Sequence, residues 1–198
     1  MLNESSIDKN PFRQFEIWYG EAYTLLGEEA SAMALSTESN NQPNSRIVYL
    51  RGEDKKGYRF FTNYNSRKGK EMEKNKKVCV LFFWNRLFRQ VKMLGHVEKL
   101  SSKASDNYFA SRARESQMGA WASQQSSAIS SRKILEDRVK EFTDLFEGKK
   151  IARPAHWGGY RFVPSYFEFW YGRENRLHDR IIFTKAKKGK WKMVRLSP

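Results

Sequence analysis

Three side chains with phosphate-binding chemistry stand at alternate positions near the carboxyl end of the chain: Arg176, His178 and Arg180. In an extended strand, residues two apart project from the same face, so this spacing predicts two guanidinium groups around an imidazole. Such a face suits a planar, phosphorylated, electron-accepting ligand. A solvated edge strand, whose charges only keep it soluble, is the alternative that the residues alone leave open.

A second basic cluster, Ser66-Arg67-Lys68-Gly69, is expected to open a short helix after a strand. Cations, free backbone N–H groups and the positive end of the helix dipole would converge there and attract an anion. A basic helix start also occurs by chance, so this cluster alone does not identify a site.

Tyr108, Arg112 and Ser116 form a third candidate, because they are spaced four residues apart. On a continuous helix this spacing aligns three hydrogen-bond donors on one face. If the helix ends near Ala113, a turn has to complete the alignment. The alternative is again a solvated helix face.

The apolar pattern predicts the elements that carry these residues: a mostly β fold with peripheral helices, closed or partly closed into a barrel. Strands are expected at 33–37, 46–51, 58–62, 78–84, 90–100, 159–163, 167–171, 180–184 and 191–196. Helices are expected from Asn10 to Gly27, Ser66 to Asn75, Ser101 to about Arg112, and Ser130 or Ser131 to Gly148. We expect one domain, 1–198, with an N-terminal helical arm (1–30), a helical insertion (101–148) and C-terminal strands (157–198).

Composition narrows the class of protein. The net charge of +15 usually suggests a polyanionic partner, but the basic residues are scattered in pairs and no nucleic-acid-binding motif accompanies them. A phosphate-handling enzyme explains the charge equally well, so nucleic-acid binding is not the primary expectation. The longest apolar run, Val78–Trp84, is too short to cross a membrane, and the start has no secretory pattern, so a cytoplasmic protein is expected. The three histidines and the single Cys79 show no metal-ligand spacing, and no metal is expected.

The amino-acid sequences of several segments resemble those of one family. Glu168-Phe169-Trp170, followed by Arg176-Leu177-His178-Asp179-Arg180, closely resembles the C-terminal signature of the FMN-dependent pyridoxine/pyridoxamine 5'-phosphate oxidases. The run from Phe61 to Lys68 resembles the flavin-phosphate segment of that family, and the run from Tyr108 to Gln117 resembles its substrate-phosphate segment. The resemblance implies an FMN-binding split β-barrel, Greek-key-like, working as a homodimer with FMN at the subunit interface.

The resemblance also implies which residues bind each ligand. FMN contacts are expected from Arg46, Ile47, Val48, Tyr49, Leu50, Arg51, Phe61, Thr62, Arg67, Lys68, Gln90, Gln125, Ser126, Trp170 and Arg180. Substrate contacts are expected from Arg51, Tyr108, Arg112, Ser116, Arg176, Leu177 and His178. Arg176 and His178 are the predicted catalytic residues, because they would place the substrate ring against the flavin.

The implied activity is oxidation of pyridoxine 5'-phosphate and pyridoxamine 5'-phosphate to pyridoxal 5'-phosphate, with oxygen as acceptor and hydrogen peroxide as product. A flavin oxidase of the same fold with another substrate, as in phenazine pathways, is one alternative. A non-catalytic module that binds pyridoxal phosphate or nucleic acid is the other.

The chain departs from the family pattern at three places. Arg51 stands where lysine is usual, Tyr171 stands where glutamine is common, and the arm before the first helix looks short. Arginine keeps the positive charge but brings a wider planar fork, so the role of position 51 is expected to differ. A substrate contact from the arm is expected to be missing or altered.

Overall fold

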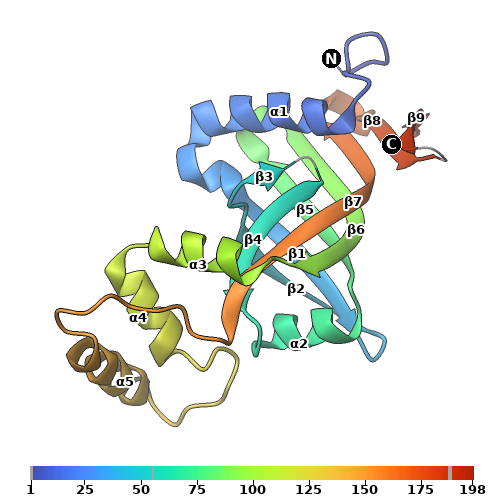
Figure 1. Cartoon of the computed structure of the whole chain (residues 1–198). Coiled ribbons are helices and arrows are strands. Elements are labelled where there is room, and N and C mark those ends of the chain that lie inside the picture. Colours follow the sequence, from blue (N-terminus) through green and yellow to red (C-terminus); the bar gives the residue numbers. More distant parts are fainter. Residues whose placement is uncertain (1, 55, 187–188) are drawn as a thin grey trace.

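The computed structural model describes residues 2–54, 56–186 and 189–198. The described strands form one antiparallel nine-stranded sheet, in the order β2-β1-β5-β6-β7-β4-β3, with β8 beside β7 and β9 beside β8 (Figure 1). The strands are β1 (Ala32–Ser39), β2 (Gln42–Tyr49), β3 (Glu53–Asp54), β4 (Gly57–Asn63), β5 (Lys77–Trp84), β6 (Arg89–Lys99), β7 (Trp157–Tyr171), β8 (Asp179–Lys185) and β9 (Trp191–Leu196). The helices are α1 (Pro11–Leu26), α2 (Arg67–Lys74), α3 (Ser102–Ala110), α4 (Arg114–Ala122) and α5 (Arg132–Leu145), with 3₁₀ turns η1 (Gly27–Ser31), η2 (Asn85–Leu87) and η3 (Glu174–Arg176).

The sheet curls into a barrel because the chain leaving β2 bonds to β4. The backbone N–H of Arg51 donates to the carbonyl of Arg59 (2.7 Å), and the N–H of Arg59 donates to the carbonyl of Gly52 (2.7 Å). These bonds join the two ends of the strand order and cover edges that would otherwise be open. The expected mostly β fold with peripheral helices is confirmed.

Helix α1 lies across the barrel and fills one end of its core (Figure 1). It begins where expected: the Asn10 side chain caps the N–H of Phe12 (3.1 Å), and Pro11 occupies the first turn. Phe15 on its inner face is fully buried, with its ring centroid 5.0 Å from that of Phe82 and 4.8 Å from that of Tyr58. Aromatic packing of this kind fixes the position of the helix on the barrel.

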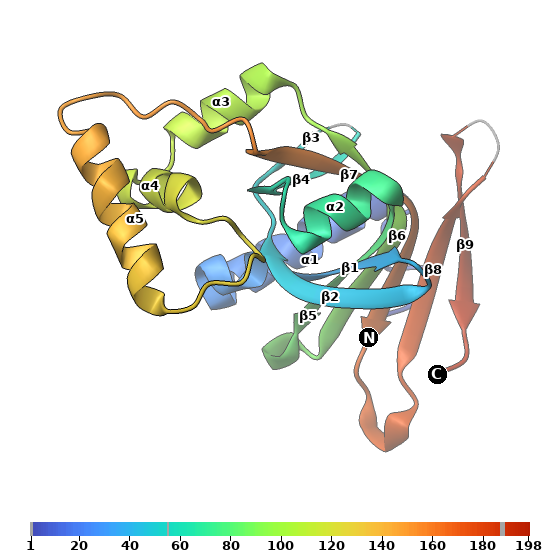
Figure 2. The same cartoon turned by 90° about the horizontal axis from the view of Figure 1, so that it is seen from below.

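Helices α3, α4 and α5 lie on one side of the barrel, and the β8–β9 hairpin lies on the opposite side (Figures 1 and 2). Under the helices a second, smaller apolar cluster gathers Phe109, Met118, Ile151 and Trp157. This cluster fixes α3 and α4 against the start of β7 and so sets the distance between the helices and the barrel.

Several elements differ from the sequence-based expectation. The strand expected at 46–51 is β2, which starts at Gln42 and ends at Tyr49, and two further differences have a visible cause. The helix expected from Ser101 to about Arg112 ends at Ala110, and a new helix, α4, follows it. The buried amide of Gln117 explains the break, because it donates to the carbonyls of Phe109 (3.1 Å) and Arg112 (2.9 Å) at the end of α3.

The strands expected at 159–163 and 167–171 are one strand, β7, that runs through Pro164. Proline lacks the N–H that a strand donates to its neighbour, so it normally interrupts a sheet. Here Gly95 of β6 pairs with Pro164 and Leu94 pairs with Tyr166, so Ser165 of β7 is an extra residue beside the proline. This bulge accommodates the missing hydrogen bond.

Candidate functional site

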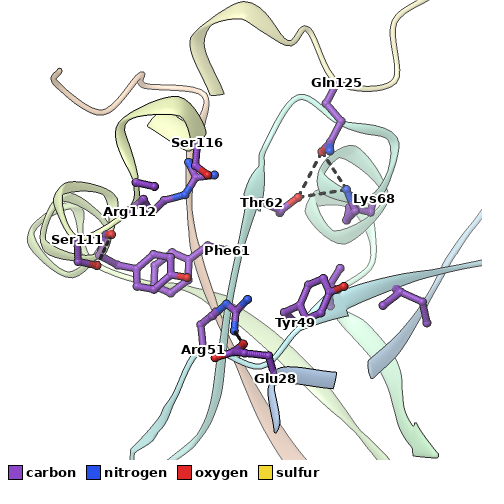
Figure 3. A pocket seen from close by; sticks show the side chains of 14 residues that line it. Glu28, Tyr49, Arg51, Phe61, Thr62, Lys68, Ser111, Arg112, Ser116 and Gln125 are labelled. Carbon is purple, nitrogen blue, oxygen red and sulfur yellow. Dashed lines mark hydrogen bonds and ion pairs between the residues drawn. The ribbon is translucent and has the colours of Figure 1, made fainter. Parts of the chain in front are cut away.

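A cavity of about 600 Å³ opens between the barrel and helices α3 and α4 (Figure 3). Its size lies within the usual range for small-molecule sites. Of the residues predicted to bind ligand, it gathers Ile47, Val48, Tyr49, Arg51, Phe61, Thr62, Lys68, Tyr108, Arg112, Ser116 and Gln125. Glu28, Ser111 and Ala113 also line it and were not predicted. Leu50 does not line it, because its side chain is buried in the core.

Lys68 marks one end of the cavity. Its Nζ atom lies 3.1 Å from Thr62 Oγ1 and 3.0 Å from Gln125 Oε1, as the dashed lines of Figure 3 show. Burial, and secondly the charge of Arg46, lowers the pKa of Lys68. Among the described residues, the hydrogen-bond partners of Lys68 are all uncharged. No carboxylate bonded to Lys68 there neutralises its ammonium group, which favours an anionic ligand at this end of the cavity.

The start of α2 brings Lys68 to this place. Ser66 caps the helix as expected, accepting the N–H of Gly69 (3.3 Å). A Cβ at Gly69 would lie 2.1 Å from the carbonyl oxygen of Tyr64, so only glycine permits this tight entry into the helix. The backbone N–H of Arg67, at the positive end of the helix, donates to Ser126 Oγ (3.2 Å).

Arg46 and Arg67 lie beside the cavity rather than on its wall, because a buried carboxylate holds them. Glu71 accepts from Arg46 (3.0 Å), Arg67 (3.0 Å) and Thr37 (2.5 Å). Burial alone would raise the pKa of Glu71, but these bonds and one from Asn44 bring it below its usual value. Arg67 and Ser126 instead line a neighbouring hollow of about 280 Å³, which shares Gln125 with the main cavity. Glu71 was not predicted, although its four-residue spacing from Arg67 was visible in the sequence.

Arg112 marks the other end of the cavity. Its guanidinium lies over the ring of Trp157, with Cζ 4.7 Å from the ring centroid. Its buried Nη1 atom has no hydrogen-bond partner in the part of the chain that the structure describes. Burial lowers the pKa of Arg112, with a smaller opposing contribution from Tyr108. A buried, unpaired cation is costly, which favours an anionic ligand at this point.

Of the two arrangements left open for Tyr108, Arg112 and Ser116, the structure has the one completed by a turn, because Arg112 lies between α3 and α4. This turn brings all three residues to the cavity wall. The ring of Tyr108 stacks on that of Phe61 with centroids 3.7 Å apart, which ties α3 to β4.

Arg51 stands at the cavity edge nearest η1. Its Nη1 donates to the Glu28 carboxylate (2.7 Å), and its guanidinium lies 5.1 Å from the centroid of the Tyr49 ring. Burial alone would lower the pKa of Arg51, but the hydrogen bond to the Glu28 carboxylate raises it above its usual value.

The remaining predicted residues form a second group around the end of β7. Neighbouring strands place Gln90 opposite Trp170, and Trp170 opposite Arg180. The His178 ring lies 4.6 Å from the Trp170 ring between centroids. The backbone N–H of Arg173 donates to His178 Nδ1 (3.1 Å), so a neutral His178 carries its proton on Nε2.

Arg180 is held by a buried carboxylate that was quoted in the signature but given no role. Glu168 accepts from Arg180 (2.7 Å), Lys92 (2.6 Å) and Tyr166 (3.0 Å). Burial alone would raise the pKa of Glu168, but its partners, Lys92 first, bring the pKa below its usual value. Glu168 therefore fixes the side chain of Arg180 beside Trp170.

The expectation that Arg176, His178 and Arg180 lie on one face of an extended strand is wrong. Asn175 (φ 54°) and Arg176 (φ 59°) adopt the left-handed conformation, and β8 begins only at Asp179. Asparagine tolerates this conformation better than most residues, which makes a turn favourable here. Arg176 and Leu177 are exposed and do not line the cavity of their own chain.

The two groups are far apart within one chain. Phe61 of the cavity pairs with Gly159, whereas Trp170 lies further along the same strand. At about 3.3 Å per residue, the path between them along β7 is about 36 Å. Neither Trp170 nor His178 lines the cavity of its own chain.

Among the described residues, no group of three or more histidine, cysteine or acidic side chains could hold a metal ion. Within residues 2–54, 56–186 and 189–198, no helix is both long and apolar enough to span a bilayer.

Comparisons with known proteins bear on most of the chain. Residues 20–146 match the family described as "Pyridoxamine 5'-phosphate oxidase", and residues 157–198 match the "Pyridoxine 5'-phosphate oxidase C-terminal dimerisation region". A protein of Cupriavidus pinatubonensis named pyridoxine/pyridoxamine 5'-phosphate oxidase is 50% identical over 100% of this chain and 93% of its own. Its namesake in Trichormus variabilis is 47% identical over 100% and 92%. The crystal structure of PhzG from Burkholderia lata, in complex with tetrahydrophenazine-1-carboxylic acid, superimposes with a TM-score of 0.92 at 26% identity, covering 100% of this chain and 98% of that one.

Proposed function

The chain belongs to the pyridoxamine 5'-phosphate oxidase family, and on that premise we propose that it oxidises pyridoxine 5'-phosphate and pyridoxamine 5'-phosphate to pyridoxal 5'-phosphate. We propose FMN as its cofactor and oxygen as the final acceptor, with hydrogen peroxide as the second product. Bound FMN supplies a ring that takes a hydride from the substrate carbon and passes the electrons to oxygen.

The donor set at one end of the cavity fits the phosphate of FMN. Lys68 is a cation whose described partners are neutral, and the positive end of α2 lies beside it. Thr62, Gln125 and Ser126 add neutral hydrogen-bonding groups suited to a phosphate or a polyhydroxyl chain. Arg46 would act mainly through its bond to Glu71, which keeps the positive charge of β2 in place beside α2.

The single observation that carries the substrate assignment is the buried Nη1 atom of Arg112, which has no hydrogen-bond partner among the described residues. The Arg112 side chain lines the cavity together with Tyr108, Ser116 and Arg51, and these four side chains could all donate to one phosphate. A second anion site in a cavity that already fits the flavin phosphate supports a substrate that carries a phosphate of its own.

A homodimer would complete the site. Residues 157–198 match a dimerisation region, and the group around Trp170 lies too far along β7 to reach the cavity of its own chain. In a dimer, each chain would supply Gln90, Trp170 and Arg180 to the flavin in the cavity of the other. Arg176 and His178 would then place the pyridine ring, with His178 donating from Nε2.

A second candidate is an oxidase of a tetrahydrophenazine carboxylic acid, because the PhzG structure holds such a ligand and superimposes over the whole chain. The relatives at 47 to 50% identity and the second cation group favour the phosphorylated substrate. Steady-state peroxide production separates the two candidates. We expect turnover of pyridoxine and pyridoxamine 5'-phosphates, and little with tetrahydrophenazine-1-carboxylic acid or unphosphorylated pyridoxine. The reverse order of kcat/KM would refute the proposal.

A further inference from the structure

One acidic side chain stands among the cations of the main cavity. Of the charged groups that the structure places on the wall, Arg51, Lys68 and Arg112 are cations and Glu28 is the carboxylate. A carboxylate is unexpected where two anionic phosphates are to bind, since like charges repel. Its position therefore calls for a role.

Glu28 is directed at one of the three cations. Its Oε2 accepts from Arg51 Nη1 at 2.7 Å, while its Oε1 lies 3.5 Å from the Tyr23 hydroxyl. Glu28 belongs to η1 and Arg51 to the segment after β2, so their ion pair bridges two elements at the cavity edge. Figure 3 shows Arg51 and Glu28 facing each other below the space between Arg112 and Lys68. The Glu28 side chain is 69% exposed and that of Arg51 33%, so a ligand could replace the carboxylate without unfolding anything.

We propose that Glu28 is the resident counterion of Arg51 and that the substrate phosphate must replace it in order to bind. The inference rests on the proposed function, because it concerns the same phosphate end of the cavity. Binding of a phosphate then exchanges one anion for another at Arg51. The affinity for free phosphate is therefore lower than it would be if Arg51 had no counterion. A phosphorylated ligand binds tightly only if it also makes hydrogen bonds to Arg112, Tyr108 and Ser116.

The identity of residue 51 agrees with this role. A guanidinium carries five N–H donors in a planar fork, and the one bond to Glu28 leaves the others available. Arg51 can thus pass from carboxylate to phosphate while staying over the Tyr49 ring. An ammonium group is a compact point charge without that fork. The pair explains how arginine serves where the family usually has lysine.

The test is the affinity of inorganic phosphate for the purified protein with the flavin it carries, measured by titration calorimetry. The flavin occupies the Lys68 end, so free phosphate reports on the Arg51 end. Glu28→Gln should tighten phosphate binding by up to about five-fold, which is the upper end of the range for an exposed ion pair. Glu29→Gln removes the same charge from the neighbouring exposed residue and should leave the affinity unchanged.

Testing Glu28→Gln a second time, in a protein that lacks Arg51, distinguishes an effect of the ion pair from long-range repulsion between Glu28 and the phosphate. In Arg51→Ala protein, Glu28→Gln should no longer tighten phosphate binding, because the cation that Glu28 occupies is gone. Equal tightening in both backgrounds, or unchanged or weaker binding in Glu28→Gln alone, would overturn the inference. Peroxide assays on pyridoxine 5'-phosphate run in parallel. If they fail while the calorimetric pattern holds, the proposed substrate is wrong and the role of Glu28 stands.

Discussion

Replacing Arg112 with methionine should stabilise the ligand-free protein and weaken the binding of phosphorylated substrate. The stability gain follows from the buried Nη1 atom, which has no partner among the described residues. Leaving a charged donor unsatisfied costs about 3 kcal/mol. The cation–π contact with Trp157, at 4.7 Å, offsets about 2 kcal/mol of that cost. Methionine keeps an apolar contact with the ring, so the net gain should be about 1 kcal/mol, or about 3 °C in Tm for a chain of this size.

The loss of substrate affinity follows from the same guanidinium group, because the Arg112 side chain lines the cavity. Hydrogen bonds from a charged donor to phosphate contribute about 2 to 3 kcal/mol, so KM for pyridoxamine 5'-phosphate should rise about 30- to 150-fold. Thermal melts in phosphate-free buffer and steady-state peroxide assays measure the two effects. FMN content should stay the same, because Arg112 lies at the end of the cavity away from Lys68 (Figure 3).

Arg114→Met is the matched control. It removes the same charge two residues away, from a side chain that bonds to the carbonyls of Phe146 and Lys149 and does not line the cavity. This variant should lower Tm and leave KM unchanged. The reasoning is refuted if Arg112→Met lowers Tm while KM stays within about two-fold of wild type, since the residue would then be structural.

Three further substitutions test other parts of the account. Glu168→Gln should cost about 3 kcal/mol at neutral pH, because it leaves two partly buried cations without a counterion. The folded-state pKa of Glu168 is lowered, so its contribution is present above the ordinary value of 4.5 and is lost as the pH falls below it. Acid unfolding should therefore depend less steeply on pH in the variant, and an unchanged slope would contradict the assignment. Lys68→Met should raise the Kd for FMN about 10- to 100-fold without loss of Tm; normal FMN binding would remove Lys68 from the site. Trp170→Ala should also weaken FMN binding although Trp170 lies away from the cavity of its own chain, and unchanged affinity would argue against a site shared between two copies.

The barrel and its first helix were predictable because their signals are local. In β5, the unbroken apolar run Val78–Trp84 is rich in valine and aromatic residues, and this composition favours a buried strand without knowledge of its neighbours. The start of α1 was equally visible, since Asn10 and Pro11 are a cap and a first-turn residue.

The breaks in the pattern were not predictable, because they depend on contacts that a repeating pattern does not show. The end of α3 depends on the amide of Gln117 in the next helix, and the passage of β7 through Pro164 accompanies an irregularity in its pairing with β6. The turn at Asn175 and Arg176 replaces a strand that the alternating residues favoured. For α3 and β7, contacts outside the segment override its local preference.

The predicted ligand-binding residues came mainly from the family resemblance, and 11 of the 21 line one cavity. The acidic partners were missed, since a glutamate in a charged helix looks like ordinary surface. Only the fold reveals that Glu71 lies between Arg46 and Arg67, or that Glu28 meets Arg51. These carboxylates decide how the cations of the site are oriented and which of them remain available to a ligand.

The central claim is that this protein carries a flavin that B6 phosphates reduce. The most direct measurement is the visible spectrum of the purified protein, mixed anaerobically with pyridoxamine 5'-phosphate. The account predicts a flavin band near ~450 nm that fades on mixing and returns when oxygen is admitted, with one hydrogen peroxide for each pyridoxal 5'-phosphate formed. A colourless protein, or a flavin band that the substrate leaves unchanged, would contradict it.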